Sequence, residues 1–112
     1  MAHGEERLAS YLKREIADFL AKRSEVPEGA FLSVTGIEIA PSLEDAKVFI
    51  LVFPESASAE AMRGLKALER EARKYLATRL KRRKIPKILF RLDQAQNREI
   101  GLEKLLEKVK NE

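Results

Sequence analysis

The segment that most constrains the fold of this 112-residue chain is an almost unbroken apolar run, Val48–Phe53. A short run rich in β-branched and aromatic residues is typical of a β-strand that is at least partly covered on both faces. The run therefore predicts a central strand. The rest of the chain has to supply the neighbouring strands and the helices that cover it.

The segments around this run alternate between helical and strand-like patterns. Leu8, Leu12 and Ile16 recur at steps of four and predict an amphipathic helix over residues 5–23. The other predicted elements are a strand over 31–39, the central strand over 46–53, a helical stretch over 59–83, a strand over 87–92, and a short closing helix marked by Leu102, Leu105, Leu106 and Val109. Gly36, inside the first strand, indicates a bulge or a close approach of another backbone.

This order predicts an α+β fold. The two early strands are joined by a short turn, so we expect them to pair antiparallel, and the third strand, which returns after a helix, is expected to run parallel to a neighbour. Helices would pack on one face of a three-stranded sheet. The chain is expected to form one domain over residues 1–112, with an ordered core from about 5 to 110.

The second face of the sheet leaves two alternatives. If Val48, Ile50 and Val52 meet the helices, Phe49, Leu51 and Phe53 lie opposite, joined by Leu89. That face is either an exposed apolar surface for docking a protein or is covered by the closing helix or an N-terminal segment. We favour coverage.

Positive charge is gathered into one quarter of the chain. Residues 63–91 hold twelve basic and two acidic residues, a net charge of +10, whereas the whole chain is only +4 and the remainder therefore sums to −6. A folded domain gains nothing from this self-repulsion, so a polyanionic partner is indicated. The predicted phosphate contacts are Arg70, Arg73, Lys74, Arg79, Lys81, Arg82, Arg83, Lys84 and Lys87, with Arg7, Arg14, Arg63 and Lys66 as further candidates.

The alternative to a binding surface is a solvated helix end. Cations near a helix C-terminus are stabilised by the helix dipole, by about 0.3–1 kcal/mol each. This effect accounts for two or three of the basic residues over 79–87, but that segment holds six: Arg79, Lys81, Arg82, Arg83, Lys84 and Lys87. We therefore favour nucleic acid, with an arc over residues 63–74 and a basic knob over 79–87. Aromatic residues are sparse, which argues against base stacking and for recognition of structured RNA by shape and charge.

Other classes of function find little support in the sequence. No cysteine is present, His3 lies in the first residues of the chain, and no carboxylate cluster or glycine-rich phosphate loop is visible. We therefore expect no catalysis, no metal and no cofactor. No apolar run approaches the roughly 20 residues of a membrane helix, and the start lacks a signal peptide, so a soluble cytoplasmic protein without membrane contact is expected.

Several motifs, in order along nearly the whole chain, resemble one family. They are Arg7 with Arg14–Ile16, Val34–Leu43 followed by Ala46–Ile50, Leu76–Leu80 followed by Arg83–Asp93, and Ile100 with Leu105–Leu106. Together they are similar to ribosome-binding factor A, a bacterial small-subunit assembly factor with a type II KH-like fold. The resemblance implies the order helix–strand–strand–helix–helix–strand plus a short C-terminal helix.

The same resemblance implies a function and partners. It implies a non-enzymatic, monomeric factor that binds the 30S subunit or its precursor and assists 16S rRNA processing and late 30S maturation, including cold adaptation. The implied partners are the 5′ region of 16S rRNA and an assembly GTPase. A generic structured-RNA-binding KH-like protein, or a protein-interaction module that uses the Phe49, Leu51 and Phe53 face, is the alternative.

The chain departs from the family pattern at two places. Ser42 stands where the family commonly has Asp. Family members also carry a small-residue kink in the second helical stretch, in place of the Gly-x-x-Gly loop of ordinary KH domains. The corresponding residues here, Leu68–Ala72, include no glycine. The sequence does not decide whether the helix kinks near Arg70.

Overall fold

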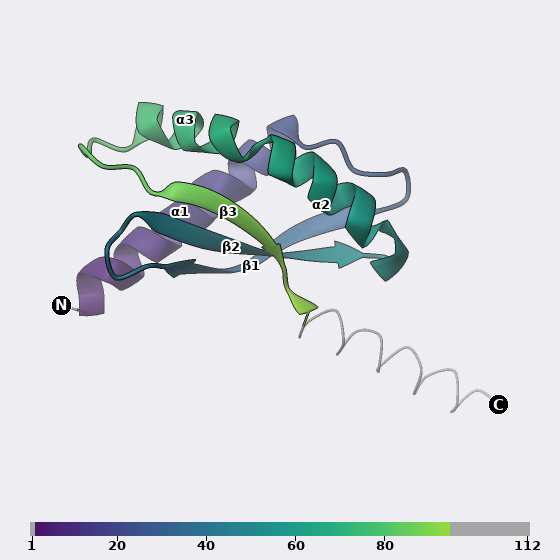
Figure 1. Ribbon diagram of the computed structural model, residues 1–112, viewed down its shortest axis with the longest axis horizontal. Helices are drawn as coiled ribbons and strands as arrows, with labels where there is room; N and C mark the ends of the chain where they lie inside the picture. The colour runs from purple at the N-terminus through teal and green to yellow at the C-terminus, as the bar shows by residue number, and fades with distance from the viewer. Residues whose placement is uncertain (1, 95–112) are drawn as a thin grey trace.

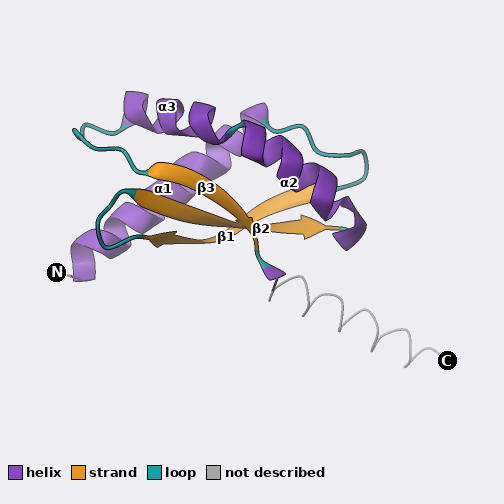
Figure 2. Ribbon diagram, in the orientation of Figure 1, coloured by secondary structure: helices purple, strands orange, loops and turns teal. Residues whose placement is uncertain are grey.

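The helices and strands follow one another in the predicted order in a computed structural model of the chain, which describes residues 2–94 (Figures 1 and 2). The elements are α1 (Ala2–Arg23), β1 (Phe31–Ile39), β2 (Asp45–Phe53), the 3-10 turn η1 (Glu55–Ala57), α2 (Ser58–Ala67), α3 (Glu69–Arg79) and β3 (Lys87–Leu92). The predicted closing helix and the predicted end of the ordered core lie outside the described residues.

The three strands form one sheet in the order β1-β2-β3. β1 pairs antiparallel with β2, and β2 pairs parallel with β3, which confirms both predicted directions. The β1–β2 register shifts between Val34 and Gly36, leaving Thr35 as the extra residue of a bulge. Nothing lies within 4 Å of a Cβ built on Gly36, so the glycine marks the bulge and not a close approach of another described segment.

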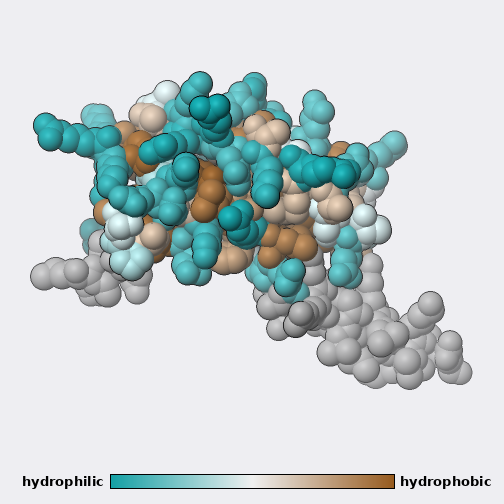
Figure 3. All heavy atoms as spheres, in the orientation of Figure 1, coloured by the Kyte–Doolittle hydropathy of each residue, from teal (hydrophilic) through white to brown (hydrophobic). Residues whose placement is uncertain are grey.

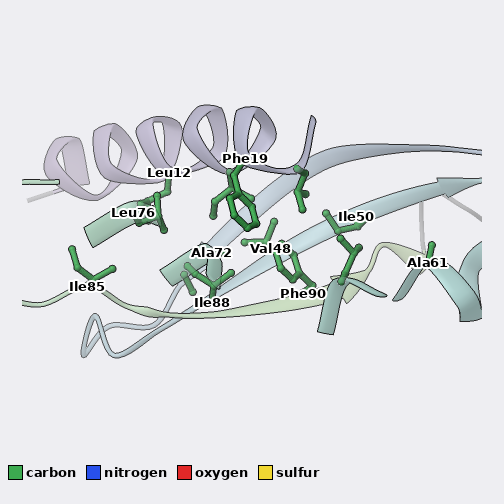
Figure 4. Packing of buried hydrophobic residues seen from close by; sticks show 14 of the residues in the cluster. Leu12, Phe19, Val48, Ile50, Ala61, Ala72, Leu76, Ile85, Ile88 and Phe90 are labelled. Carbon is green, nitrogen blue, oxygen red and sulfur yellow. The ribbon is translucent and has the colours of Figure 1, made fainter. Parts of the chain in front are cut away.

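The core lies between the helices and one face of the sheet. The predicted stripe of α1 buries Leu12 and Ile16 against Val48 and Ile50 of the central strand, and α3 adds Leu76. Figure 4 shows Leu12, Val48, Ile50 and Leu76, with Ile88 and Phe90 of β3, pointing into the same space. The alternation of β2 is therefore as predicted, with Val48, Ile50 and Val52 on the helix side.

The other face of the sheet is only partly covered by the described residues. Phe49, Leu51, Phe53 and Leu89 are half-buried there, and Phe53 packs its ring against Phe31 at a centroid distance of 5.5 Å. Figure 3 shows apolar atoms over the sheet and hydrophilic side chains along the edge where α2 and α3 lie. Whether the closing helix covers this face stays a prediction, because that helix lies outside the described residues.

The helical stretch predicted over 59–83 differs from the structure in two ways. It breaks at Leu68, where α2 ends and α3 begins, and it stops at Arg79 instead of reaching residue 83. Leu80 is extended (φ −96°, ψ 127°), and the next buried residue is Ile85. The end of the helix thus follows from the anchoring of Leu80 and Ile85 in the core, which forces the residues between them into a loop.

The break at Leu68 occurs without a glycine. The N–H of Leu68 bonds to the carbonyl of Leu65, three residues back, at 2.9 Å, and α2 and α3 run in different directions (Figure 1). Glu69, just after the break, accepts a hydrogen bond from the backbone N–H of Phe90 at 2.8 Å. β3 is an edge strand, and the N–H of Phe90 points away from β2, so no strand pairs with it. The break at Leu68 therefore places the Glu69 carboxylate where it satisfies this N–H group.

We expect Leu76→Ala to lower the free energy of unfolding by about 2–5 kcal/mol, because the fully buried side chain leaves a cavity. The control is Leu89→Ala, which removes the same atoms from a half-buried position on the outer sheet face. Urea denaturation followed by circular dichroism measures both. Equal losses would contradict the placement of the core on the helix side.

Gly64→Ala is expected to raise the free energy of unfolding by roughly 0.5–1 kcal/mol, because glycine costs entropy inside a helix. The added Cβ has room, since its nearest neighbour is the carbonyl oxygen of Glu25 at 3.9 Å. The same denaturation experiment checks it, and a loss of stability would show that α2 is not regular at this position.

Candidate nucleic-acid interface

The predicted basic residues lie mostly along the connection from β2 to β3. Arg63 and Lys66 are exposed on α2, and Arg70, Arg73 and Lys74 are exposed on α3. The predicted arc over 63–74 is therefore divided between two helices that meet at Leu68. Its cations still follow one another over the outer side of the helical layer.

The predicted knob is a loop instead of a helix end. Its four consecutive cations, Lys81–Lys84, are all exposed, and we call them the basic loop. Half-buried Leu80 precedes the loop, and buried Ile85 and Pro86 follow it. These apolar anchors hold both ends, so the loop presents its cations to solvent from a fixed base.

Two contacts tie the basic loop to its surroundings. The Nε of Arg73 donates to the carbonyl of Ile85 at 3.1 Å, which joins α3 to the end of the loop. Lys84 Nζ lies 3.6 Å from Glu44 Oε1 in the β1–β2 turn, and both side chains are exposed. An exposed ion pair contributes little, typically about 0–1 kcal/mol. Lys84 therefore remains accessible to a stronger anion, whereas Arg73 has a structural task as well.

Arg79 is engaged within the molecule. Its Nε donates to the carboxylate of Glu15 on α1, which is only 7% exposed, and its guanidinium lies 5.2 Å from the ring centroid of Tyr75. The hydrogen bond to Glu15, reinforced by the charge of that carboxylate, raises the pKa of Arg79. A buried carboxylate needs a partner. Arg79 thus joins α1 to α3.

Seven other cations on this connection make no such contact within the described part of the chain. Within residues 7–94, no side-chain hydrogen bond or ion pair involves any of them. They are Arg63, Lys66, Arg70, Lys74, Lys81, Arg82 and Arg83. Their charge is uncompensated at short range, which leaves them available to an external anion.

The remaining predicted residues lie elsewhere. Lys87 alternates with Ile88 along β3, so its side chain lies on the outer sheet face with Leu89 and not with the α3 cations. On α1, Arg7 is exposed, and Arg14 lies on the side that faces β1, 5.8 Å from the ring centroid of Tyr11. The structure therefore brings together the cations of α2, α3 and the basic loop, but not these three.

One cation that the sequence analysis did not select joins the α3 group. Lys22, in the last turn of α1, lines a hollow of about 360 Å³ together with Lys74, Tyr75 and Thr78 of α3. Its neighbour Arg23 is paired with Glu71. The only sequence signal was a basic last turn, which the helix dipole already explains.

Two other kinds of feature are not found among the described residues. Among them, no group of three His, Cys, Asp or Glu side chains could hold a metal ion. No described helix is long and apolar enough to span a membrane.

Comparison with known proteins decides the family. The model of the family described as ribosome-binding factor A matches residues 4–106. The chain belongs to the ribosome-binding factor A family. A ribosome-binding factor A from Halothermothrix orenii is 37% identical over 107 residues, which cover 95% of this chain and 88% of that protein.

Two solved structures have the same fold. The crystal structure of ribosome-binding factor A from Thermus thermophilus superposes with a TM-score of 0.69 at 24% identity, covering 80% of this chain and 96% of that one. A homology model of the Thermus thermophilus factor, fitted into a cryo-EM map of its complex with the 30S subunit, gives a TM-score of 0.63 at 24% identity and covers 77% and 91%. The predicted fold and family are confirmed.

We expect Arg79→Met to lower the thermal unfolding midpoint, because it strands the buried carboxylate of Glu15. Arg70→Met is the matched control, since Arg70 is also an α3 cation but has no partner among the described residues. Adding Glu15→Gln to Arg79→Met should recover part of the loss. Equal midpoints for the two single variants, measured by calorimetry, would show that the pair does not join α1 to α3.

Proposed function

We propose that this protein binds the 30S ribosomal subunit or its precursor through the cations of α2, α3 and the basic loop. The observation that carries the proposal is the gathering of exposed, unpaired cations on one connection of the fold. The contacts would be to rRNA phosphates, made by Arg70, Arg73, Lys74, Lys81, Arg82, Arg83 and Lys84, with Arg63, Lys66 and Lys22 beside them. Family membership and the 30S complex of the Thermus thermophilus factor support this partner.

Within that function, the protein would act by binding and not by catalysis. A surface that binds one rRNA conformation more tightly than another shifts the population toward it by the difference in binding free energy. The aromatic residue of α2, α3 and the basic loop is Tyr75, and its ring already packs against Phe19 and Arg79. This surface would therefore recognise RNA by charge and backbone shape and not by base stacking. This mode of action suits assistance to 16S rRNA processing and late 30S maturation, including in the cold.

The remaining parts of the proposal follow from the family. They are a site in the 5′ region of 16S rRNA, release by an assembly GTPase, a monomeric state and a cytoplasmic location. Arg79 and Lys87 stay in the proposal as secondary contacts, since Arg79 is shared with Glu15 and Lys87 lies on the other sheet face. Arg7 and Arg14, on α1, would contribute least.

Arg82→Glu/Arg83→Glu tests the proposal. This double variant reverses two exposed cations that have no partner among the described residues, and it spares Lys84 and Arg73, which touch other parts of the fold. We expect co-sedimentation with 30S subunits to fall at least tenfold. The logarithm of the affinity should also depend less on the logarithm of salt, by roughly 1.5 in slope for two lost phosphate contacts.

Lys13→Glu/Lys47→Glu is the matched control, with the same change in net charge at two exposed positions, on α1 and β2, that lie outside the proposed contacts. It should keep at least most of the binding. Unchanged co-sedimentation of the Arg82→Glu/Arg83→Glu variant with 30S subunits would contradict the proposed role of the basic loop. If the affinity for the 30S subunit depends neither on salt concentration nor on the charge-reversal substitutions, the apolar sheet face is favoured as the docking surface instead.

A further inference from the structure

A groove lies on the other side of α1, away from α3 and the basic loop. It runs between α1 and the first half of β1 and has a volume of about 690 Å³. Its lining extends from Ser10 to Ala21 on the helix and from Phe31 to Val34 on the strand, with Ser24, Val26 and Ala30 from the connection between them. Apolar side chains from both elements form most of its lining. We call it the α1–β1 groove.

The strand that borders the groove is an edge of the sheet. β1 pairs with β2 on one side, and no described strand pairs with it on the other. An edge strand presents a row of backbone N–H and C=O groups to solvent, and proteins commonly protect it with proline or charge. Residues 31–34 of β1 are Phe, Leu, Ser and Val, so this half of the edge carries neither.

The exposed large hydrophobic side chains of residues 7–94 lie at this groove. Among the residues whose burial is described, the exposed large hydrophobic residues are Val26, at 36%, and Phe31, at 51%, and both line it. Isolated exposed apolar residues need no explanation, but these two lie beside an unpaired strand edge, and the ring of Phe31 also contacts Phe53 on the outer face of the sheet. That edge is suited to the alternate side chains of an added strand.

The charge at the groove selects the partner. The ionisable side chains that line it are Lys13 and Arg14, and both are cationic. A second copy of this chain would bring another Lys13 and Arg14 to the same interface, because a two-fold contact uses the same patch on both subunits. An acidic partner would instead gain from the two cations.

We propose that the α1–β1 groove binds an extended, acidic peptide segment of a partner protein, which adds to the sheet as a fourth strand beside β1. Its backbone pairs with the free edge of β1 over residues 31–34. Apolar side chains of the peptide pack on Val26 and Phe31, and carboxylates pair with Lys13 and Arg14. The site is independent of the basic loop, so the protein can hold a polyanion and an acidic protein segment at the same time.

A phage-displayed library of random twelve-residue peptides, selected on the full chain, tests this proposal. We expect enriched peptides to combine alternating apolar residues with acidic ones. A synthetic copy of the enriched sequence should bind saturably in fluorescence anisotropy. By NMR, it should shift and protect backbone amides of residues 31–34.

Three variants separate the outcomes. Lys13→Glu/Arg14→Glu and Phe31→Ser should each weaken the peptide at least tenfold while urea denaturation shows that they fold, and Arg82→Glu/Arg83→Glu should leave peptide binding unchanged. In the 30S assay, Arg82→Glu/Arg83→Glu should lose binding and Phe31→Ser should keep it, so each proposal can fail alone.

The proposal is overturned if no peptide is enriched, if enriched peptides lack acidic residues, or if the groove variants bind equally well. It is also overturned if amide shifts fall on α3, if a uridine oligonucleotide displaces the peptide from the groove, or if sedimentation velocity detects a dimer that Phe31→Ser abolishes.

Discussion

The parallel pairing of β3 with β2 governs the arrangement of the whole molecule. Two parallel neighbours require the chain to return across the full length of the sheet, and here that return is made by α2, α3 and the basic loop. Because the connection packs against the helix side of the sheet, its outer surface becomes one exposed side of the protein. The excess of positive charge between residues 63 and 87 is therefore the charge of a single structural unit, the crossover.

Within that unit, cations perform two kinds of task. Arg79 and Arg73 hold the fold together, the first through buried Glu15 and the second through the carbonyl of Ile85. The cations of the basic loop hold little or nothing inside the protein. In the free protein, the mutual repulsion of the basic-loop cations is therefore not offset by contacts within the fold. A bound polyanion would relieve this repulsion. Electrostatic strain in the free state is thus part of the driving force for association.

The sequence predicts the elements and their pairing because these depend on local periodicity. The alternation in Val48–Phe53, the stripe of α1 and the short turn before β2 are enough for sheet order and core. The break at Leu68 and the end of α3 depend on contacts between distant residues, namely Glu69 with Phe90 and Leu80 and Ile85 with the core. For the same reason, charge alone could not distinguish Arg79, paired with a residue 64 positions away, from its unpaired neighbours.

The bulged β1–β2 hairpin and the long crossover also differ in how quickly they can form. The hairpin joins residues that are close in sequence, so its loop closes at little entropic cost, whereas β3 must find β2 across more than thirty intervening residues. We therefore expect docking of β3 to be slower than formation of the hairpin. Because Ile85 lies just before β3, the second end of the basic loop is fixed only when β3 docks. In a nascent chain, the four cations of the basic loop would therefore lack a fixed position until β3 has been synthesised, whereas those of α2 and α3 lie on helices that form from local contacts.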